Sequence, residues 1–154
     1  MTETIDMRLK ALGISIPDAA APAANYVPFA KSGNLLLTSG QLPLADGKLV
    51  STGLVGDTLS VAEGQEAAKA AAINVLAQAK AALGDLNRIS RIVKITVFVA
   101  SAPGFTEQHL VANGGSNLFV DVLGDAGRHA RSAVGVASLP FNAPVEIEAI
   151  IEVE

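Results

Sequence analysis

The 154-residue sequence contains no cysteine, which excludes disulfides, thiolate metal sites and a cysteine nucleophile. Charged residues are also scarce, at 17% of the chain against about 25% in average domains. The N-terminus is acidic and lacks the apolar segment of a signal peptide. No apolar stretch approaches the ~20 residues that a membrane-spanning helix needs. Together with the length, these absences predict one cytoplasmic domain, 1–154, that spans no membrane.

Basic residues are too few for a nucleic-acid-binding surface. Lys and Arg number 11 against 15 Asp and Glu, the formal net charge is −4, and no basic run occurs. Proteins that bind nucleic acids usually need a basic face, so no nucleic-acid partner is expected. Hydrophobic residues, in contrast, make up 50% of the chain. Apolar surface in excess of what a monomer needs usually lies in an interface, so the composition favours an oligomer.

The first part of the chain predicts a helix, an arm and two hairpins. A helix is expected within 1–13, capped by Thr2 and ended by Gly13, followed by a connecting arm rich in Ala and Pro over 14–25. Turn signals then separate short β-prone runs. The predicted strands cover 26–31 and 35–39, and Asp46-Gly47 marks a tight turn before a further short strand near Leu49.

Two longer helices are predicted in the rest of the chain. Ser60 and Glu63 have the spacing of a capping box, and Gly84 is a typical C-terminal stop. A second helix is expected over 106–123, although Gly114-Gly115 weakens its middle.

Three strands accompany these helices. The β-branched run 92–100 predicts a strand buried on both faces, and strands over 131–138 and 144–154 follow. This order of elements predicts an α+β fold with one mixed β-sheet and the two main helices packed on one face. The other face must then be polar or meet another subunit.

Two charged residues of the last strands are candidate site residues. Glu146, Glu148, Glu152 and Glu154 share one side of the last strand, which indicates either a solvated acidic face or a site in which Glu146 pairs with a nearby base. Arg131 begins the preceding strand. It is either a surface charge or a residue whose guanidinium binds a carboxylate through two parallel hydrogen bonds. If these two strands pair antiparallel, Arg131 lies near the far end of the last strand. Arg131 and Glu146 could then be close only across a boundary between two subunits or in a different register.

Other polar residues give weaker signals. His109 and His129 lack the spacing of metal ligands and are typical of ordinary surface or core residues, so no metal site is predicted. Residues 124–127 follow a helix and indicate a helix stop rather than a phosphate loop. Tyr26 and Asn113 are compatible with hydrogen-bonded buried groups.

Several segments in combination are more specific. They are Thr38-Ser39-Gly40-Gln41, residues 93–99, and residues 130–140 followed by Val145-Glu146-Ile147-Glu148-Ala149. At this spacing the chain after residue 20 resembles the Rid family, also called YjgF-like or L-PSP proteins. The resemblance implies a chorismate-mutase-like fold and a homotrimer with active sites between neighbouring subunits.

The resemblance also implies a reaction, the hydrolysis of reactive 2-imino or enamine acids to 2-keto acids and ammonia, without metal or cofactor. Arg131 would bind the substrate carboxylate and Glu146 would hold the attacking water. The other residues that it places at the site are Tyr26, Ser39, Gly40 and Asn113. A non-catalytic module that binds small carboxylates and an endoribonuclease are the alternative functions.

The sequence departs from the best-known branch of the family at three places. Arg128-His129 stands where a Phe-Pro pair is usual, Gly135 replaces a frequent glutamate, and the helix before residue 13 is additional. We expect these departures to leave the fold intact and to bear on the substrate. Arg128-His129 would either add positive charge at the mouth of the cleft or stabilise the loop.

Overall fold

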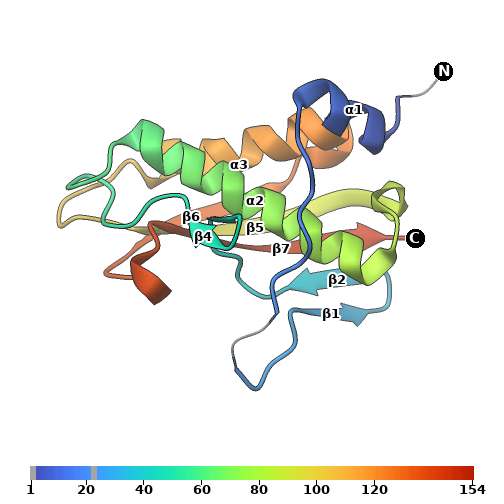
Figure 1. The fold of residues 1–154 in the computed structure, drawn as a ribbon, viewed down its shortest axis with the longest axis horizontal. Helices are drawn as coiled ribbons and strands as arrows, with labels where there is room; N and C mark the ends of the chain where they lie inside the picture. Colours follow the sequence, from blue (N-terminus) through green and yellow to red (C-terminus); the bar gives the residue numbers. More distant parts are fainter. Residues whose placement is uncertain (1–2, 22–23) are drawn as a thin grey trace.

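The computed structural model describes residues 3–21 and 24–154 and confirms the predicted α+β fold with one mixed sheet (Figure 1). The elements are α1 (Ile5–Leu12), β1 (Phe29–Ser32), β2 (Leu35–Thr38), β3 (Leu44–Ala45), β4 (Lys48–Leu49), α2 (Val61–Leu83), η1 (Leu86–Arg88), β5 (Ile89–Ala100), α3 (Gln108–Leu123), η2 (Gly124–Gly127), β6 (Ala130–Val136), η3 (Pro140–Asn142) and β7 (Val145–Val153).

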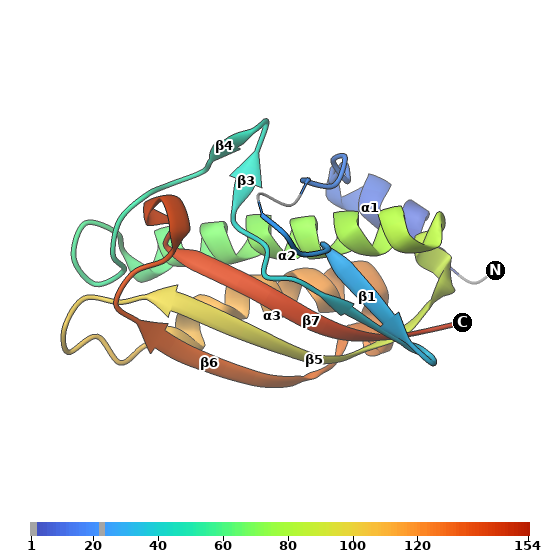
Figure 2. The same ribbon diagram turned by 90° about the horizontal axis from the view of Figure 1, so that it is seen from below.

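The main sheet has the strand order β1-β2-β7-β5-β6, and β5 and β6 are its parallel pair. The separate β3-β4 hairpin turns at Asp46-Gly47 as predicted, where both residues have positive φ. Helices α2 and α3 lie side by side on one face of the sheet, and none of the described helices covers the other face (Figures 1 and 2).

The helix ends follow local capping chemistry. The predicted capping box of α2 is present, since the Ser60 hydroxyl accepts from the Glu63 N–H and the Glu63 carboxylate accepts from the Ser60 N–H, each at 3.1 Å. Gly84 ends this helix with φ 79°, also as predicted. Helix α1 is capped by Thr4, whereas the predicted cap, Thr2, lies outside the described residues. No helix in the described ranges is long and apolar enough to cross a bilayer.

Helix α3 continues through Gly114 and Gly115, where its sequence indicated weakness. A Cβ on Gly114 would lie 2.1 Å from the carbonyl oxygen of Gln65 on α2, and one on Gly115 would lie 2.9 Å from the Ile147 side chain. The glycines therefore allow α3 to pack directly on α2 and on the sheet, and this packing outweighs their low helix propensity. The helix begins at Gln108 rather than at the predicted 106.

The strands differ from their predicted pattern at three points. Strand β1 begins three residues later than predicted, so Tyr26 precedes the sheet. Strand β5 is not buried on both faces in the single chain. Its residues Ile95 and Val97 are fully buried under the helices, but Phe98 faces the uncovered side and is partly exposed. Strands β6 and β7 do not pair with each other, because β5 lies between them.

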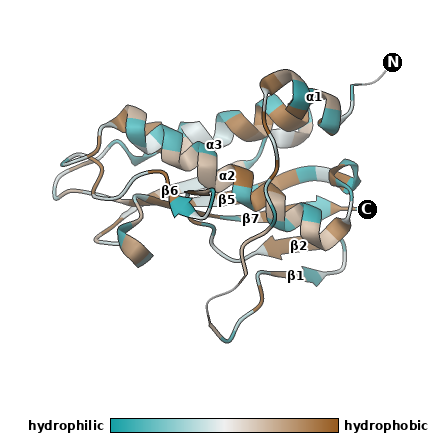
Figure 3. Cartoon of the chain, in the orientation of Figure 1, coloured by the Kyte–Doolittle hydropathy of each residue, from teal (hydrophilic) through white to brown (hydrophobic). Residues whose placement is uncertain are grey.

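The uncovered sheet face is not uniformly polar. Three apolar side chains point away from the helices on this face. Leu35 and Leu37 on β2 are 38% and 39% exposed, and Val134 on β6 is 42% exposed. Figure 3 shows β2 in brown, whereas the edge strand β1 is teal toward its arrowhead. Of the two expectations for this face, a polar surface or contact with another subunit, the apolar residues favour the second.

The glycine contacts predict the sign of a stability change. Gly→Ala in a helix normally raises stability by up to ~1 kcal/mol, but the Gly114→Ala methyl group would overlap the backbone at Gln65. We expect this variant to lose about 1–3 kcal/mol of unfolding free energy in urea titrations. Asn117→Ala, at an exposed position of the same helix, should change it by less than about 0.5 kcal/mol. A Gly114→Ala protein as stable as wild type would contradict this packing.

Candidate functional site

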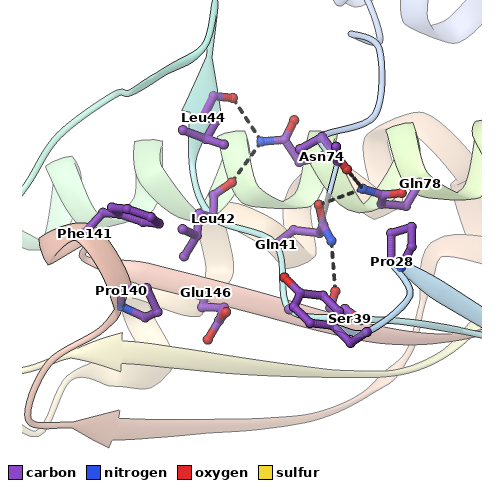
Figure 4. Close-up of a pocket in the computed structure, with 14 residues that line it drawn as sticks. Pro28, Ser39, Gln41, Leu42, Leu44, Asn74, Gln78, Pro140, Phe141 and Glu146 are labelled. Carbon is purple, nitrogen blue, oxygen red and sulfur yellow. Dashed lines mark hydrogen bonds between the residues drawn. The ribbon is translucent and has the colours of Figure 1, made fainter. Parts of the chain in front are cut away.

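A cavity of about 280 Å³ opens beside the segment that joins β2 to β3 (Figure 4). The Glu146 carboxylate lies in it, at the second position of β7. The wall is mainly apolar, with a few amide and hydroxyl groups. The lining residues are Ala20, Ala21, Tyr26, Pro28, Ser39, Gly40, Gln41, Leu42, Leu44, Asn74, Gln78, Pro140, Phe141 and Glu146.

The Ser39-Gly40-Gln41 segment is fixed on both sides of its glycine. The Ser39 hydroxyl donates to the Val27 carbonyl at 2.7 Å, and the Gln41 N–H donates to the Ile147 carbonyl at 2.8 Å. A Cβ on Gly40 would lie 2.6 Å from a carboxylate oxygen of Glu146. A side chain at this position would therefore displace the Glu146 carboxylate, because the backbone passes directly against it.

Burial is the main influence on the pKa of the Glu146 carboxyl group. Removal from water raises the pKa of Glu146, and repulsion from the neighbouring Glu148 carboxylate raises it further. No basic side chain forms a salt bridge with Glu146 among residues 3–21 and 24–154, so the predicted pairing with a nearby base is not found in the described chain. The carboxyl group therefore holds a proton to higher pH than an exposed glutamate.

Arg131 lies at the edge of the sheet and reaches toward α3. Its Nη1 donates to Asn113 Oδ1 at 2.9 Å and to the Ser116 hydroxyl at 3.1 Å, and its Nη2 donates to the His109 carbonyl at 3.2 Å. In the described part of the chain no residue accepts from its Nε–H. A second cavity, of about 240 Å³, is lined here by Ser116, Val120, Arg128, His129 and Arg131. A fixed guanidinium with an unused donor in a cavity can bind an anion.

Arg131 and Glu146 do not share a pocket within one chain. In the sheet register, Arg131 pairs with Ile95, which pairs with Ala149, three residues from Glu146. The two residues are thus about 10 Å apart along the strands and about 10 Å apart across them. Arg131 is on the helix side of the sheet, whereas Glu146 alternates with Ile147 and points to the uncovered side.

The structure therefore divides the residues that the sequence analysis assigned to one site. Tyr26, Ser39, Gly40 and Glu146 line the first cavity, and Asn113 binds the guanidinium at the second. Tyr26 is 52% exposed, so the interpretation as a buried tyrosine was wrong.

The sequence analysis missed Ser116 and the buried amides Gln41, Asn74 and Gln78. Ser116 could have been predicted from the sequence, because residues three apart on a helix share a face and Asn113 was already a candidate. Asn74 and Gln78 share a face of α2, but no local pattern connects them with Gln41, which lies in a distant segment.

The two-layer α+β fold is that of a YjgF-like protein, and the comparisons agree. The profile of the family described as "YjgF/chorismate_mutase-like, putative endoribonuclease" matches residues 6–152. This chain belongs to that family.

Its relatives span several kingdoms. Protein TCP17 of Trypanosoma cruzi is 56% identical over 145 residues, which cover 94% of this chain and 91% of that protein. The crystal structure of Atu1372, a protein of unknown function from Agrobacterium tumefaciens, is 60% identical with a TM-score of 0.92, covering 97% of this chain and 92% of that one. Escherichia coli TdcF with bound serine is 28% identical with a TM-score of 0.65, covering 88% and 94%.

The raised pKa of Glu146 predicts a pH effect on stability. Because this pKa lies above the ordinary 4.5, the folded protein binds more protons than the unfolded chain between the two values. The unfolding free energy contributed by Glu146 is therefore fully present below 4.5 and is lost as pH rises through the folded pKa. Glu146→Gln removes this titration, so urea unfolding from about pH 4 to about pH 8 should show a smaller loss of stability than in wild type. Glu66→Gln, at an exposed position on α2, should retain the wild-type slope, and an unchanged slope in Glu146→Gln would contradict the burial.

Proposed function

We propose that this protein hydrolyses the reactive imines or enamines of small 2-keto acids to the keto acid and ammonia. The observation that carries this proposal is the division of the site. A fixed guanidinium with a free N–H lines one cavity, and a carboxyl group of raised pKa, on a side chain that points to the other sheet face, lines a second cavity.

We further propose that the protein is a homotrimer in which the Arg131 cavity of one protomer meets the Glu146 cavity of its neighbour. Apolar side chains on the uncovered sheet face support an association on that side. Association also supplies what each cavity lacks, a carboxylate-binding cation for one and a proton acceptor for the other.

In the proposed reaction Arg131 holds the substrate carboxylate and Glu146 positions a water near the iminium carbon. The water oxygen bonds to this carbon, the C=N electron pair moves to nitrogen, and Glu146 takes a water proton. The resulting carbinolamine is protonated on nitrogen by Glu146. The C–N bond then breaks, the hydroxyl proton returns to Glu146 as the C=O bond forms, and ammonia leaves as ammonium after taking that proton. A base is most effective when its pKa is close to the working pH, and burial moves Glu146 in that direction.

Two alternatives receive different support. The bound serine of TdcF, a small amino acid with a carboxylate, is compatible both with turnover and with a binding module for small carboxylates. Ribonuclease activity, which the family description names, has less support, since acidic residues outnumber basic ones in this chain.

Arg131 variants test the reaction. With 2-iminobutyrate generated in a coupled assay, we expect Arg131→Ala to lower kcat/KM about 100-fold, because the carboxylate loses a charged hydrogen-bond partner. Arg131→Lys should restore little, since lysine has no planar pair of donors. Arg8→Ala, on α1, is the matched control and should retain activity. Binding of 2-oxobutyrate without acceleration of hydrolysis would favour the binding module, and RNA cleavage that disappears in Arg131→Ala would favour the ribonuclease.

Subunit mixing tests the location of the site. Arg131→Ala and Glu146→Gln should each be inactive alone, but a site built from two protomers is intact wherever one variant contributes Glu146 and the other Arg131. Unfolding and refolding an equal mixture should restore about a quarter of the wild-type activity in randomly assembled trimers. Activity restored in no mixture, with trimers formed, would show that both residues act within one chain.

A further inference from the structure

A chain of hydrogen bonds continues behind Arg131 beyond the residues that the proposed function uses. The guanidinium donates to the Ser116 hydroxyl at 3.1 Å, and this hydroxyl lies 2.8 Å from His129 Nε2. The other ring nitrogen, Nδ1, lies 2.6 Å from the Gly127 carbonyl oxygen. These contacts link the anion-binding end of Arg131 to the backbone between α3 and β6.

The chemistry of these groups fixes the direction of each bond. The Gly127 carbonyl can only accept, so His129 Nδ1 must carry a proton. In a neutral ring Nε2 then has a free lone pair and accepts the Ser116 O–H proton. The Ser116 oxygen keeps lone pairs for the Arg131 N–H, and every group in the chain has a partner of the right kind.

The surroundings hold the His129 ring neutral and in place. Burial lowers the pKa of His129 most, and the positive charge of Arg131 lowers it further, although the bond to Gly127 opposes both. The Phe119 ring packs edge-to-face on His129, with ring centroids 5.9 Å apart. The charged side chains of the adjacent loop, Arg128 and Asp125, are exposed and pair with each other at 3.5 Å.

We propose that Ser116 and His129 are positioning residues, which hold the Arg131 guanidinium so that its unused N–H groups face an incoming carboxylate. Both protons of Nη1 are donated, to Asn113 and Ser116, and one proton of Nη2 is donated to the His109 carbonyl. The Nε–H and the second proton of Nη2 remain to bind a ligand. A guanidinium held in this way loses less rotational freedom when a ligand binds.

The same chain accounts for a departure in the sequence. His129 stands in the pair Arg128-His129, where the best-known branch of the family has Phe-Pro, and neither of those residues could accept a bond from Ser116 through its side chain. The positioning chain is thus a feature of this sequence. The proposal rests on the proposed function only for the identity of the ligand, a small 2-keto or 2-imino acid.

Ser116 variants test the proposal by separating binding from turnover. We expect Ser116→Ala to weaken 2-oxobutyrate binding about tenfold in Kd and to raise KM about tenfold in the 2-iminobutyrate assay, with kcat within about twofold of wild type. Ser116→Thr keeps the hydroxyl and should restore most of the affinity. His129→Leu removes the acceptor and should resemble Ser116→Ala. Ser90→Ala, at the beginning of β5, is the matched control and should bind like wild type.

A spectroscopic measurement on the wild-type protein provides a test that needs no variant. The ¹⁵N chemical shifts of the His129 ring should show the neutral tautomer protonated at Nδ1, and the Nε2 resonance should shift in Ser116→Ala. An Nε2-protonated ring, or unchanged Kd in both Ser116→Ala and His129→Leu, would overturn the proposal. If wild type binds 2-oxobutyrate without hydrolysing imines, the proposed function fails while the Kd comparison still tests the positioning.

Discussion

The register of one central strand determines how this protein can assemble a reactive site. Strand β5 separates β6 from β7, so Arg131 and Glu146 lie two strands apart and on opposite faces of the sheet. Side-chain rotation cannot overcome this separation, because neighbouring positions of a strand alternate between faces. Each chain therefore carries the two residues in separate pockets, and the proposed reaction, which needs both residues, requires a second chain.

Close backbone contacts at glycine support each pocket. Gly40 lets the loop after β2 run against the Glu146 carboxylate, while Gly114 lets α3 lie on α2. The docking of α3 in turn places Asn113 and Ser116 over the edge strand, where they bind the guanidinium. The close approaches at these two glycines thus hold the elements together and also place the polar side chains of the two pockets. A methyl group added at either glycine would disturb both the packing and the pocket beside it.

Local chemistry made much of the fold predictable from sequence. The capping box at Ser60, the stop at Gly84 and the Asp46-Gly47 turn depend on neighbouring residues alone. Alternation likewise predicted the acidic side of β7, on which Glu146 and Glu152 are partly buried and Glu148 is exposed. The interpretation of Gly114-Gly115 as a weak point failed because it considered propensity without the partner helix.

Long-range geometry was not predictable in the same way. The sequence could not show that β5 separates β6 from β7, and the antiparallel pairing of the last strands that it considered does not occur. The Ser116–His129 link was also missed, because it joins a helix to the loop before a strand and neither residue forms a motif alone. The family resemblance predicted which residues form the site. Only the register of β5 with β6 and β7 shows that these residues fall into two groups.

A crystal structure of the protein with 2-oxobutyrate would test the central claim most directly. The account predicts that the keto acid lies between two protomers, with its carboxylate on Arg131 of one and its carbonyl carbon facing Glu146 of the other. A keto acid bound within one protomer, or an Arg131 side chain that faces solvent away from any neighbouring chain, would contradict it.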